Sequence, residues 1–303
     1  MLSYENFNSY NGWYDLKVRK KIRNLLLQDR KLGIEFLYHL NTGKKLDFKT
    51  LDSYGKVIQY IKLILNPIKI NAYSDKLLVR NYLEKKGLAF LLPKIFFVFK
   101  SCKDIDFKDL PSNSVIKMSN GWNQNIYMKN IKNKKCVEQT LHILKSWQNQ
   151  EFGLYTAEMQ YIGFKNTIYC EEYLGENIRE VKFYCINGEP EFYEIDENRY
   201  SDHKRNFFNL NNDPLNITLG VLSNKNCKCI SRDKLDLMIK YSKELSRDFA
   251  HVRVDFNYAL DRILFSELTF TPAAGYKSFY PKKFDKKFSY KVLNAIKSKC
   301  EFI

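Results

Sequence analysis

The amino-acid sequence predicts an α+β fold, in which helices and short strands form packed layers. The chain has 303 residues, of which 45% are hydrophobic, enough for about two domains and a sizeable core. Helical and strand patterns are mixed along it, without the regular β-α alternation of a doubly wound sheet. Only 12 Gly and 7 Pro occur, which excludes collagen-like and low-complexity chains.

The first third of the chain is predicted to be helical. Apolar residues at helical spacing predict one helix over residues 16–40 and another over 53–65, which ends at Asn66-Pro67. Ser74-Asp75 is a capping pair, and it predicts a third helix over 76–86 that ends at Gly87.

Short β-branched and aromatic runs predict strands farther along the chain. Asn187-Gly188 separates two of them and predicts a tight hairpin. Two more helices are expected, over residues 136–148 and 232–249. The strand runs are 90–99, 114–118, 166–174, 181–186 and 191–195.

The cysteines and the N-terminus indicate a cytoplasmic protein. The seven cysteines are odd in number and contain no CxxC pair, so we expect them to be reduced. Cys227 and Cys229 are a possible zinc pair, but no second pair accompanies them. No signal peptide is evident, and the longest apolar stretch, 88–99, is too short to cross a bilayer. Peripheral contact with the inner membrane face stays open.

The charge is strongly positive, because 50 Lys and Arg against 34 Asp and Glu give +16. Three partners suit that charge: nucleic acid, an anionic membrane face, or an anionic substrate such as a nucleotide. A solvated Lys-rich surface explains it equally well. No aromatic-basic motif is present, so we expect no nucleic-acid partner.

The most informative segment, residues 251–270, predicts two antiparallel strands joined by a turn near Asp261. Strict alternation places Phe265, Glu267 and Thr269 on one face, and this turn brings Asp255 opposite Glu267 and Arg253 opposite Thr269. Adjacent carboxylates repel each other, and a bound Mg²⁺ removes that repulsion. Alternatively, Arg253 neutralises Asp255 on a solvated face.

Other polar residues are ambiguous when taken singly. Lys117 precedes a turn that contains Gly121 and could hold phosphates, although an exposed strand Lys is commoner. Glu180 and Lys182 lie two residues apart on one face of a strand, a spacing that suits a local ion pair. A donor-rich loop follows at residues 197–206 and could clamp an anion; it contains Arg199, His203 and Arg205.

The order of these pieces resembles the ATP-grasp superfamily, and within it the TupA-like group linked to bacterial teichuronopeptide and surface-polysaccharide synthesis. The resemblance covers about residues 46–288. Its pieces, in chain order, are Ser74-Asp-Lys-Leu-Leu-Val-Arg80, Val115-Ile-Lys117, Glu171-Glu-Tyr-Leu174, Glu180-Val-Lys182, Val252-Arg-Val-Asp255 and Glu267-Leu-Thr-Phe-Thr-Pro272.

The resemblance implies an ATP-grasp fold, in which two α+β subdomains grip ATP. It implies a helical segment over residues 1–70, a first subdomain over 71–170 and a second over 171–303. Lys76, Lys117 and Gly121 would hold the nucleotide phosphates, and Arg253 the transferring phosphate. The remaining implied roles are Glu171, Glu172, Tyr173 and Leu174 beside adenine, Glu180 and Lys182 facing the nucleotide, Asp255, Glu267 and Thr269 on Mg²⁺, and Arg199, His203 and Arg205 on the acceptor side.

One segment departs from the family pattern. TupA-like proteins usually carry His-Gly-Ser-Gly-Trp-Asn after the Lys, whereas here Lys117 is followed by Met-Ser-Asn-Gly-Trp-Asn. The His and one Gly are missing, and a loop without that Gly closes less freely over phosphates.

The activity that the resemblance implies is ATP-dependent ligation of a carboxylate to an amine through an acyl phosphate. An amino acid or a uronic acid of a bacterial surface glycan is the expected substrate, with ATP and Mg²⁺ as cofactors. The alternatives are a kinase on the same fold, a glycosyltransferase of the same pathway, and a non-catalytic basic protein that binds glycan or nucleic acid.

Overall fold

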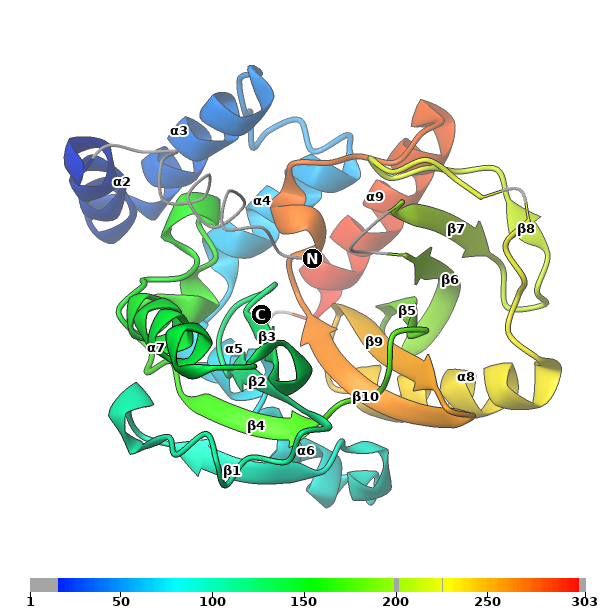
Figure 1. Cartoon of the computed structure of the whole chain (residues 1–303). Helices are drawn as coiled ribbons and strands as arrows, with labels where there is room; N and C mark the ends of the chain where they lie inside the picture. The colour runs from blue at the N-terminus through cyan, green and yellow to red at the C-terminus, as the bar shows by residue number, and fades with distance from the viewer. Residues whose placement is uncertain (1–15, 199–201, 225, 300–303) are drawn as a thin grey trace.

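Two antiparallel sheets and the helices around them make up the protein (Figure 1). The computed structural model describes residues 16–198, 202–224 and 226–299. One sheet has four strands and the other has six, and helices cover both, so the α+β class is confirmed. In the described residues, no helix is both long and apolar enough to cross a membrane.

The N-terminal helices are shorter than the apolar periodicity predicts. The stretch predicted as one helix is two, α2 (Leu16–Gln28) and α3 (Arg30–Thr42). They separate at Asp29, whose side chain accepts the Leu32 N–H at 2.9 Å and caps α3. Helix α4 (Tyr54–Ile64), capped by Ser53, confirms the prediction for 53–65.

The segment after α4 contains a helix that the sequence pattern did not predict. Pro67 begins α5 (Pro67–Ser74), because a proline at the first turn needs no N–H partner. Helix α6 (Val79–Lys85) starts three residues later than predicted. The Asp75 carboxylate accepts the N–H groups of Leu77 and Leu78 and makes a separate turn there.

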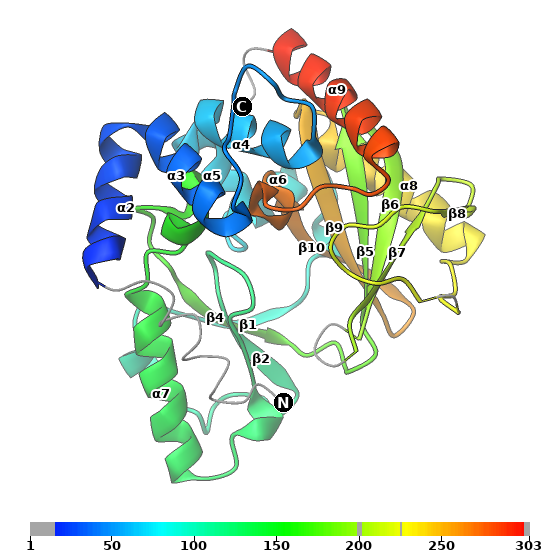
Figure 2. The ribbon, with the colours of Figure 1, turned by 90° about the horizontal axis from the view of Figure 1, so that it is seen from above.

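The four-stranded sheet has the order β1-β4-β2-β3. Only the second half of the predicted 90–99 strand is extended, because Pro93 and a short 3-10 turn precede it. Helix α7 (Lys134–Gln148) lies along this sheet (Figure 2), and its Leu144 and Trp147 pack with Ile116 and Ile168. The strands are β1 (Ile95–Phe99), β2 (Ser114–Met118), β3 (Asn125–Tyr127) and β4 (Ile168–Glu172).

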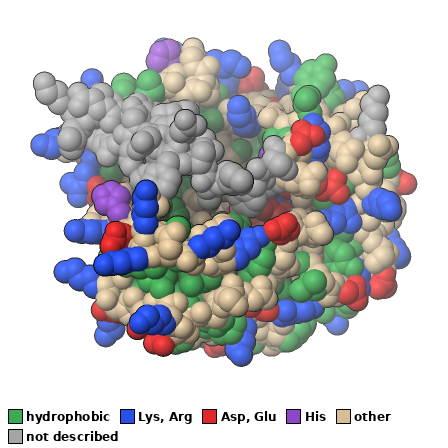
Figure 3. Space-filling model, viewed as in Figure 1, with side chains coloured by type: hydrophobic (Ala, Val, Ile, Leu, Met, Phe, Trp, Pro, Cys, Tyr) green, Lys and Arg blue, Asp and Glu red, His purple; other side chains and the backbone are tan. Residues whose placement is uncertain are grey.

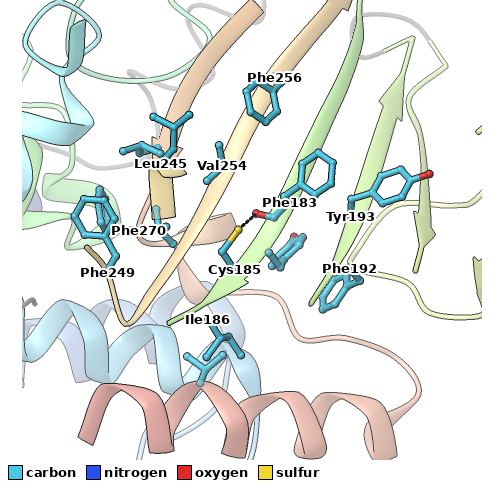
Figure 4. Packing of buried hydrophobic residues seen from close by; sticks show 14 of the residues in the cluster. Phe183, Cys185, Ile186, Phe192, Tyr193, Leu245, Phe249, Val254, Phe256 and Phe270 are labelled. Atoms are coloured by element: carbon cyan, nitrogen blue, oxygen red, sulfur yellow. Dashed lines mark hydrogen bonds between the residues drawn. The ribbon is translucent and has the colours of Figure 1, made fainter. Parts of the chain in front are cut away.

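The six-stranded sheet has the order β10-β9-β5-β6-β7-β8. Helices α8 (Arg232–Ser246) and α9 (Lys282–Ser298) lie on opposite sides of it (Figure 2). Phe183, Val254 and Phe256 line its apolar interior (Figure 4). The strands are β5 (Arg179–Ile186), β6 (Glu189–Glu197), β7 (Lys204–Phe208), β8 (Pro214–Leu215), β9 (His251–Ala259) and β10 (Arg262–Thr269).

Helix α9 is a second helix that the sequence pattern did not predict. Its signal is a run of apolar residues at every fourth position, of which Phe288, Val292 and Ile296 are buried and Phe284 is half-buried. Six short 3-10 turns complete the described elements: η1 (Ala89–Leu91), η2 (Cys102–Asp104), η3 (Met128–Asn130), η4 (Leu154–Thr156), η5 (Met159–Tyr161) and η6 (Pro272–Gly275).

Three hydrophobic clusters bear on the predicted division at residues 70 and 170, which stays a prediction. Side chains of α4 and α6, such as Val57 and Leu83, share one cluster with the six-stranded sheet. The four-stranded sheet has its own cluster, and β4 crosses position 170 within it. Helices α2 and α3 pack with the segment 154–159.

Candidate active site

The β9–β10 hairpin places the two predicted metal carboxylates side by side. Asp255 pairs with Glu267, and Arg253 pairs with Thr269, as predicted. The chain turns through Leu260 and Asp261, which both have positive φ, as a two-residue hairpin turn requires. Ladder pairing from that turn alone would bring position 266 opposite Asp255. A bulge between positions 265 and 267 shifts the register by one residue.

The same bulge overturns one predicted face. Strict alternation predicts that Phe265 shares a face with Glu267 and Thr269. Instead Phe265 pairs with Phe256 and is buried in the apolar core. The extra residue in the bulge lets two side chains of equal parity point to opposite faces of the sheet.

Arg253 is bound to Asp255 by a bidentate ion pair. Its Nε lies 2.7 Å from Asp255 Oδ1 and its Nη2 lies 2.6 Å from Oδ2. The ion pair of the alternative interpretation is therefore present, but Arg253 and Asp255 are both buried, so the face is not solvated. Burial raises the pKa of Asp255 to about 7; Arg253 opposes that rise and Glu267 adds to it. The Thr269 hydroxyl donates to Glu267 at 2.9 Å.

These side chains form an all-oxygen donor set that fits Mg²⁺. Asp255 and Glu267 supply carboxylates, and Thr269 supplies a hydroxyl. Within the described ranges, no group of three or more His, Cys, Asp or Glu residues could hold a metal ion. Two protein carboxylates suit Mg²⁺, which completes its shell with water and phosphate oxygens.

The two predicted phosphate-binding lysines each have a partner within the protein. Lys76 Nζ donates to the carbonyl of Gly121, and Lys117 Nζ lies 2.5 Å from Glu171 Oε1. Burial lowers the pKa of Lys76, and Glu267 is the strongest of the charges that raise it. Lys117 and Glu171 also act on Lys76. Lys76 therefore lies within electrostatic reach of both Glu267 and Lys117.

Gly121 holds the turn after β2 in a conformation that suits glycine. Its φ is 111°, and a Cβ at this position would lie 2.9 Å from the Phe152 ring. Trp122 packs edge-on against the same ring, with 5.2 Å between the ring centroids. The altered glycine loop therefore packs against Phe152, and the Gly121 carbonyl accepts a hydrogen bond from Lys76.

The predicted adenine segment ends β4, where the chain leaves the four-stranded sheet. Glu171 pairs with Lys117, and Glu172 pairs with Arg262 of β10 at 2.8 Å. Tyr173 stacks edge-on with Tyr127, and Leu174 is buried with Ala259 and Leu264. The segment lies where the chain passes from one sheet to the other, and the adenine role stays a prediction.

Lys182 is buried among acids on the polar face of the six-stranded sheet. The predicted pair with Glu180 is confirmed at 2.9 Å, Glu194 lies at 3.4 Å, and Asp196 is in direct contact. Burial acts to lower the pKa of Lys182, but Glu180, Asp196 and Glu194 together raise it. Lys182 lies directly opposite Glu194, because a bulge between Tyr184 and Cys185 shifts by one residue the register that starts at Asn187-Gly188.

Asp196 also holds two of the predicted acceptor-side residues. Arg205 binds it with Nε at 2.7 Å and Nη2 at 2.8 Å, and His203 Nε2 lies 3.0 Å from Oδ1. Arg205 also donates to the carbonyl of Leu219. Arg199 lies outside the described residues. The acceptor roles stay predictions, and Arg205 would have to leave Asp196 to bind a substrate.

Three buried titratable residues were not singled out in the sequence. His251 has the partners that its context did not reveal: Nδ1 bonds the Cys185 carbonyl and Nε2 bonds the Tyr54 hydroxyl, both at 2.9 Å. Lys62 lies on the buried face of α4, four residues after buried Ile58. That helical spacing is the sequence signal for the burial of Lys62. Glu158, near Lys62, carried no signal.

Comparison with known families decides the fold. A protein-family model described as "TupA-like ATPgrasp" matches residues 56–292. The chain belongs to the TupA-like ATP-grasp family. This match confirms the resemblance and the ATP-grasp fold, and it runs from α4 into α9. No curated protein sequence matches the chain significantly.

Several solved structures are similar to this ATP-grasp chain. A D-alanine–D-alanine ligase from Bacillus anthracis is 16% identical over 74% of this chain and 66% of its own, with a TM-score of 0.46. An L-amino acid ligase from Bacillus licheniformis is 12% identical over 82% and 57%, with a TM-score of 0.46. An N5-carboxyaminoimidazole synthase from Aspergillus clavatus, in complex with ADP and 5-aminoimidazole ribonucleotide, is 12% identical over 66% and 45%, with a TM-score of 0.41. The chain thus spans less than two thirds of the length of each.

Proposed function

We propose that this ATP-grasp protein is an ADP-forming carboxylate–amine ligase. The observation that carries the proposal is the pairing of Asp255 with Glu267, which lies within electrostatic reach of Lys76. Carboxylates on rigid strands suit Mg²⁺, and lysine ammonium groups suit phosphate oxygens. Membership of the family supports ATP as the nucleotide.

Each group then has a part in positioning the nucleotide. Lys76 and Lys117 bind phosphate oxygens, and Arg253 binds the phosphate that is transferred. Asp255, Glu267 and Thr269 hold Mg²⁺, which when bound neutralises charge on those oxygens. Positioning of this kind accounts for much of phosphoryl-transfer catalysis.

The proposed reaction has two steps. A substrate carboxylate oxygen attacks the γ-phosphorus, the bond from that phosphorus to the β–γ bridging oxygen breaks, and ADP leaves. The nitrogen of an amine then attacks the acyl carbon, phosphate leaves, and the nitrogen loses a proton to give the amide. We propose that Arg253 stabilises the phosphate in both steps.

The proposed substrate is an amino acid or a uronic acid of a bacterial surface polysaccharide. The TupA-like family and the +16 charge, which suits an anionic glycan, support this class. Lys and Arg side chains are spread over the face seen in Figure 3, with Asp and Glu among them. We propose a cytoplasmic location, with peripheral contact at the inner membrane face for a lipid-linked glycan.

The test is ADP release from Mg-ATP with a panel of amino acids and uronic acids, with mass spectrometry of the products. An amide together with ADP is expected. AMP instead of ADP would exclude the acyl phosphate, and a phosphorylated product without amide would identify a kinase.

Variants of the paired acids test the site itself. Asp255→Asn and Glu267→Gln should each lower kcat by about 100-fold or more, since each removes one metal-binding charge. Asp261→Asn, in the exposed turn of the same hairpin, is the matched control and should keep its activity. A non-catalytic binding protein would be favoured by two results together. The wild type would show no ATP turnover, and the variant that combines Asp255→Asn with Glu267→Gln would bind glycan as well as the wild type does.

A further inference from the structure

A buried polar network lies next to the proposed site and takes no part in the chemistry described above. Its centre is Lys62, which is fully buried. Lys62 Nζ donates to the carbonyls of Thr156 and Ala274, at 2.5 Å each, and to Gln59 Oε1 at 3.2 Å. All three N–H groups of the Lys62 ammonium therefore have an acceptor. The hydrogen bonds to Thr156 and Ala274 join α4 to two other segments of the chain.

Glu158 forms the second arm of this network. It is buried and accepts hydrogen bonds from the hydroxyl groups of Thr156, at 2.7 Å, and of Thr271. The Thr271 hydroxyl accepts in turn from Gln160 Nε2 at 3.0 Å. Because Thr271 lies two residues after Thr269, Glu158 and Gln160 fix the backbone directly after β10.

The loop after Thr271 needs such support, since its backbone is strained. Ala273 and Ala274 have φ of 51° and 49°, in the left-handed region that costs a non-glycine residue about 1 kcal/mol or more. Gln59 Nε2 donates to the carbonyls of Ala274 and Gly275, at 3.1 and 2.9 Å. Helix α4 thus donates three hydrogen bonds to this loop, one from Lys62 and two from Gln59, and they hold the strained backbone in place.

The segment that contains Glu158 and Gln160 is also linked to the glycine loop, through Asn71. Asn71 Nδ2 donates to the Gln160 carbonyl at 2.8 Å and to Asn120 Oδ1 at 3.3 Å. Asn120 precedes Gly121, whose carbonyl contacts Lys76. Residues 156–160 therefore contact the loop after the metal strand directly and the phosphate loop through Asn71.

We propose that Lys62, Glu158 and Thr271 are positioning residues, which hold the end of β10 so that Glu267 and Thr269 face the bound magnesium–nucleotide. The inference rests on the proposed function for the nucleotide and the metal. None of the three touches the reacting atoms, and each acts through the backbone of β10 and its loop. Groups that bond metal ligands directly are typically worth 10- to 100-fold in metal affinity, and these residues act one step farther from the ligands.

The experiment compares two substitutions of one hydroxyl. Thr271→Val keeps the shape and removes the hydroxyl, whereas Thr271→Ser keeps it. The readout is the dissociation constant of Mn²⁺, measured by electron paramagnetic resonance on the full chain with a non-hydrolysable ATP analogue. We expect about tenfold weaker Mn²⁺ binding in Thr271→Val and a change of less than about twofold in Thr271→Ser.

A matched control separates positioning from general loss of stability. Ser289→Ala removes a buried hydroxyl that bonds the Asp285 carbonyl on α9, outside the network, and its Mn²⁺ affinity should stay that of wild type. Wild-type affinity in Thr271→Val, or an equal loss in Ser289→Ala, would overturn the positioning role while leaving the proposed function intact. Absence of nucleotide-dependent Mn²⁺ binding in the wild type would overturn both. Should Thr271→Val not fold, Glu158→Gln replaces it, with the same expectation of weaker binding.

Discussion

At the scale of single residues, the charged side chains of the candidate site neutralise one another. Arg253 binds Asp255, Lys117 binds Glu171, and Lys182 binds Asp196. Charges in such buried positions are expensive without a partner, so pairing is expected before any ligand arrives. A magnesium–nucleotide would exchange these partners rather than enter an array of free charges.

His251 leads to the first prediction, which concerns pH. Burial lowers the pKa of His251 to about 4, the Cys185 carbonyl opposes this, and Arg253 adds to it. Between pH 6.5 and 4 the unfolded chain therefore binds a proton that the folded chain does not. The free energy of unfolding should fall as the pH falls through this window, by about 3 kcal/mol at most from this residue.

Urea denaturation at pH 7 and at pH 4.5 measures this contribution. In His251→Gln the fall between the two pH values should be smaller than in wild type, because the titrating group is gone. His39→Gln, at an exposed position on α3, is the control and should keep the wild-type fall. An equal fall in all three proteins would contradict the prediction.

At the scale of elements, side-chain caps and buried polar anchors determine where helices begin and how they dock. Asp29 divides α2 from α3, and Ser53 caps α4. Asp285 of α9 is buried, and its Oδ1 accepts the backbone N–H groups of Tyr54, at 3.2 Å, and Phe279, at 2.9 Å. One carboxylate oxygen thus docks α9 against the start of α4.

The second prediction is that Asp285→Ala destabilises the protein, whereas Asp285→Asn does so much less. Alanine leaves two buried N–H groups without an acceptor, at a cost of about 2 to 4 kcal/mol. Asparagine keeps the Oδ1 that both groups use. The midpoint of urea denaturation measures the difference, and equal loss in the two variants would show that charge rather than the acceptor oxygen matters.

At the scale of the whole molecule, the candidate site is assembled by two sheets with separate hydrophobic clusters. Lys76 follows α5 and Lys117 lies on the four-stranded sheet, whereas Asp255 and Glu267 lie on the six-stranded sheet. A ligand that bridges these parts binds the folded state alone. Its binding should therefore stabilise the whole protein.

The third prediction is a rise in melting temperature with Mg²⁺ and a non-hydrolysable ATP analogue. At about 100 times the dissociation constant, binding adds about 2.7 kcal/mol, which raises the melting temperature by several degrees. Lys76→Ala should reduce the rise, and Lys240→Ala, at an exposed position on α8, should not. A rise with single-stranded DNA that exceeds the rise with the nucleotide would instead favour the nucleic-acid alternative.

Local patterns in the sequence determined a large part of this protein. Period-two alternation and turn residues predicted the two strands of the β9–β10 hairpin and the Asn187-Gly188 turn between β5 and β6. They also predicted the pairing of Asp255 with Glu267, although in the structure that register depends on the bulge before Glu267. The strands and turns depend on residues close together in the chain, so short-range geometry is enough to derive them.

Only the tertiary structure decided the rest. The Lys62 and Glu158 network and the Tyr54–His251 contact join positions that no local pattern relates. The bulge before Glu267, which sets the register of the hairpin, follows no local pattern either. Whether a Lys is solvated or buried, and which acid it meets, depends on the packing of distant segments and on the high cost of leaving a buried charge unpaired.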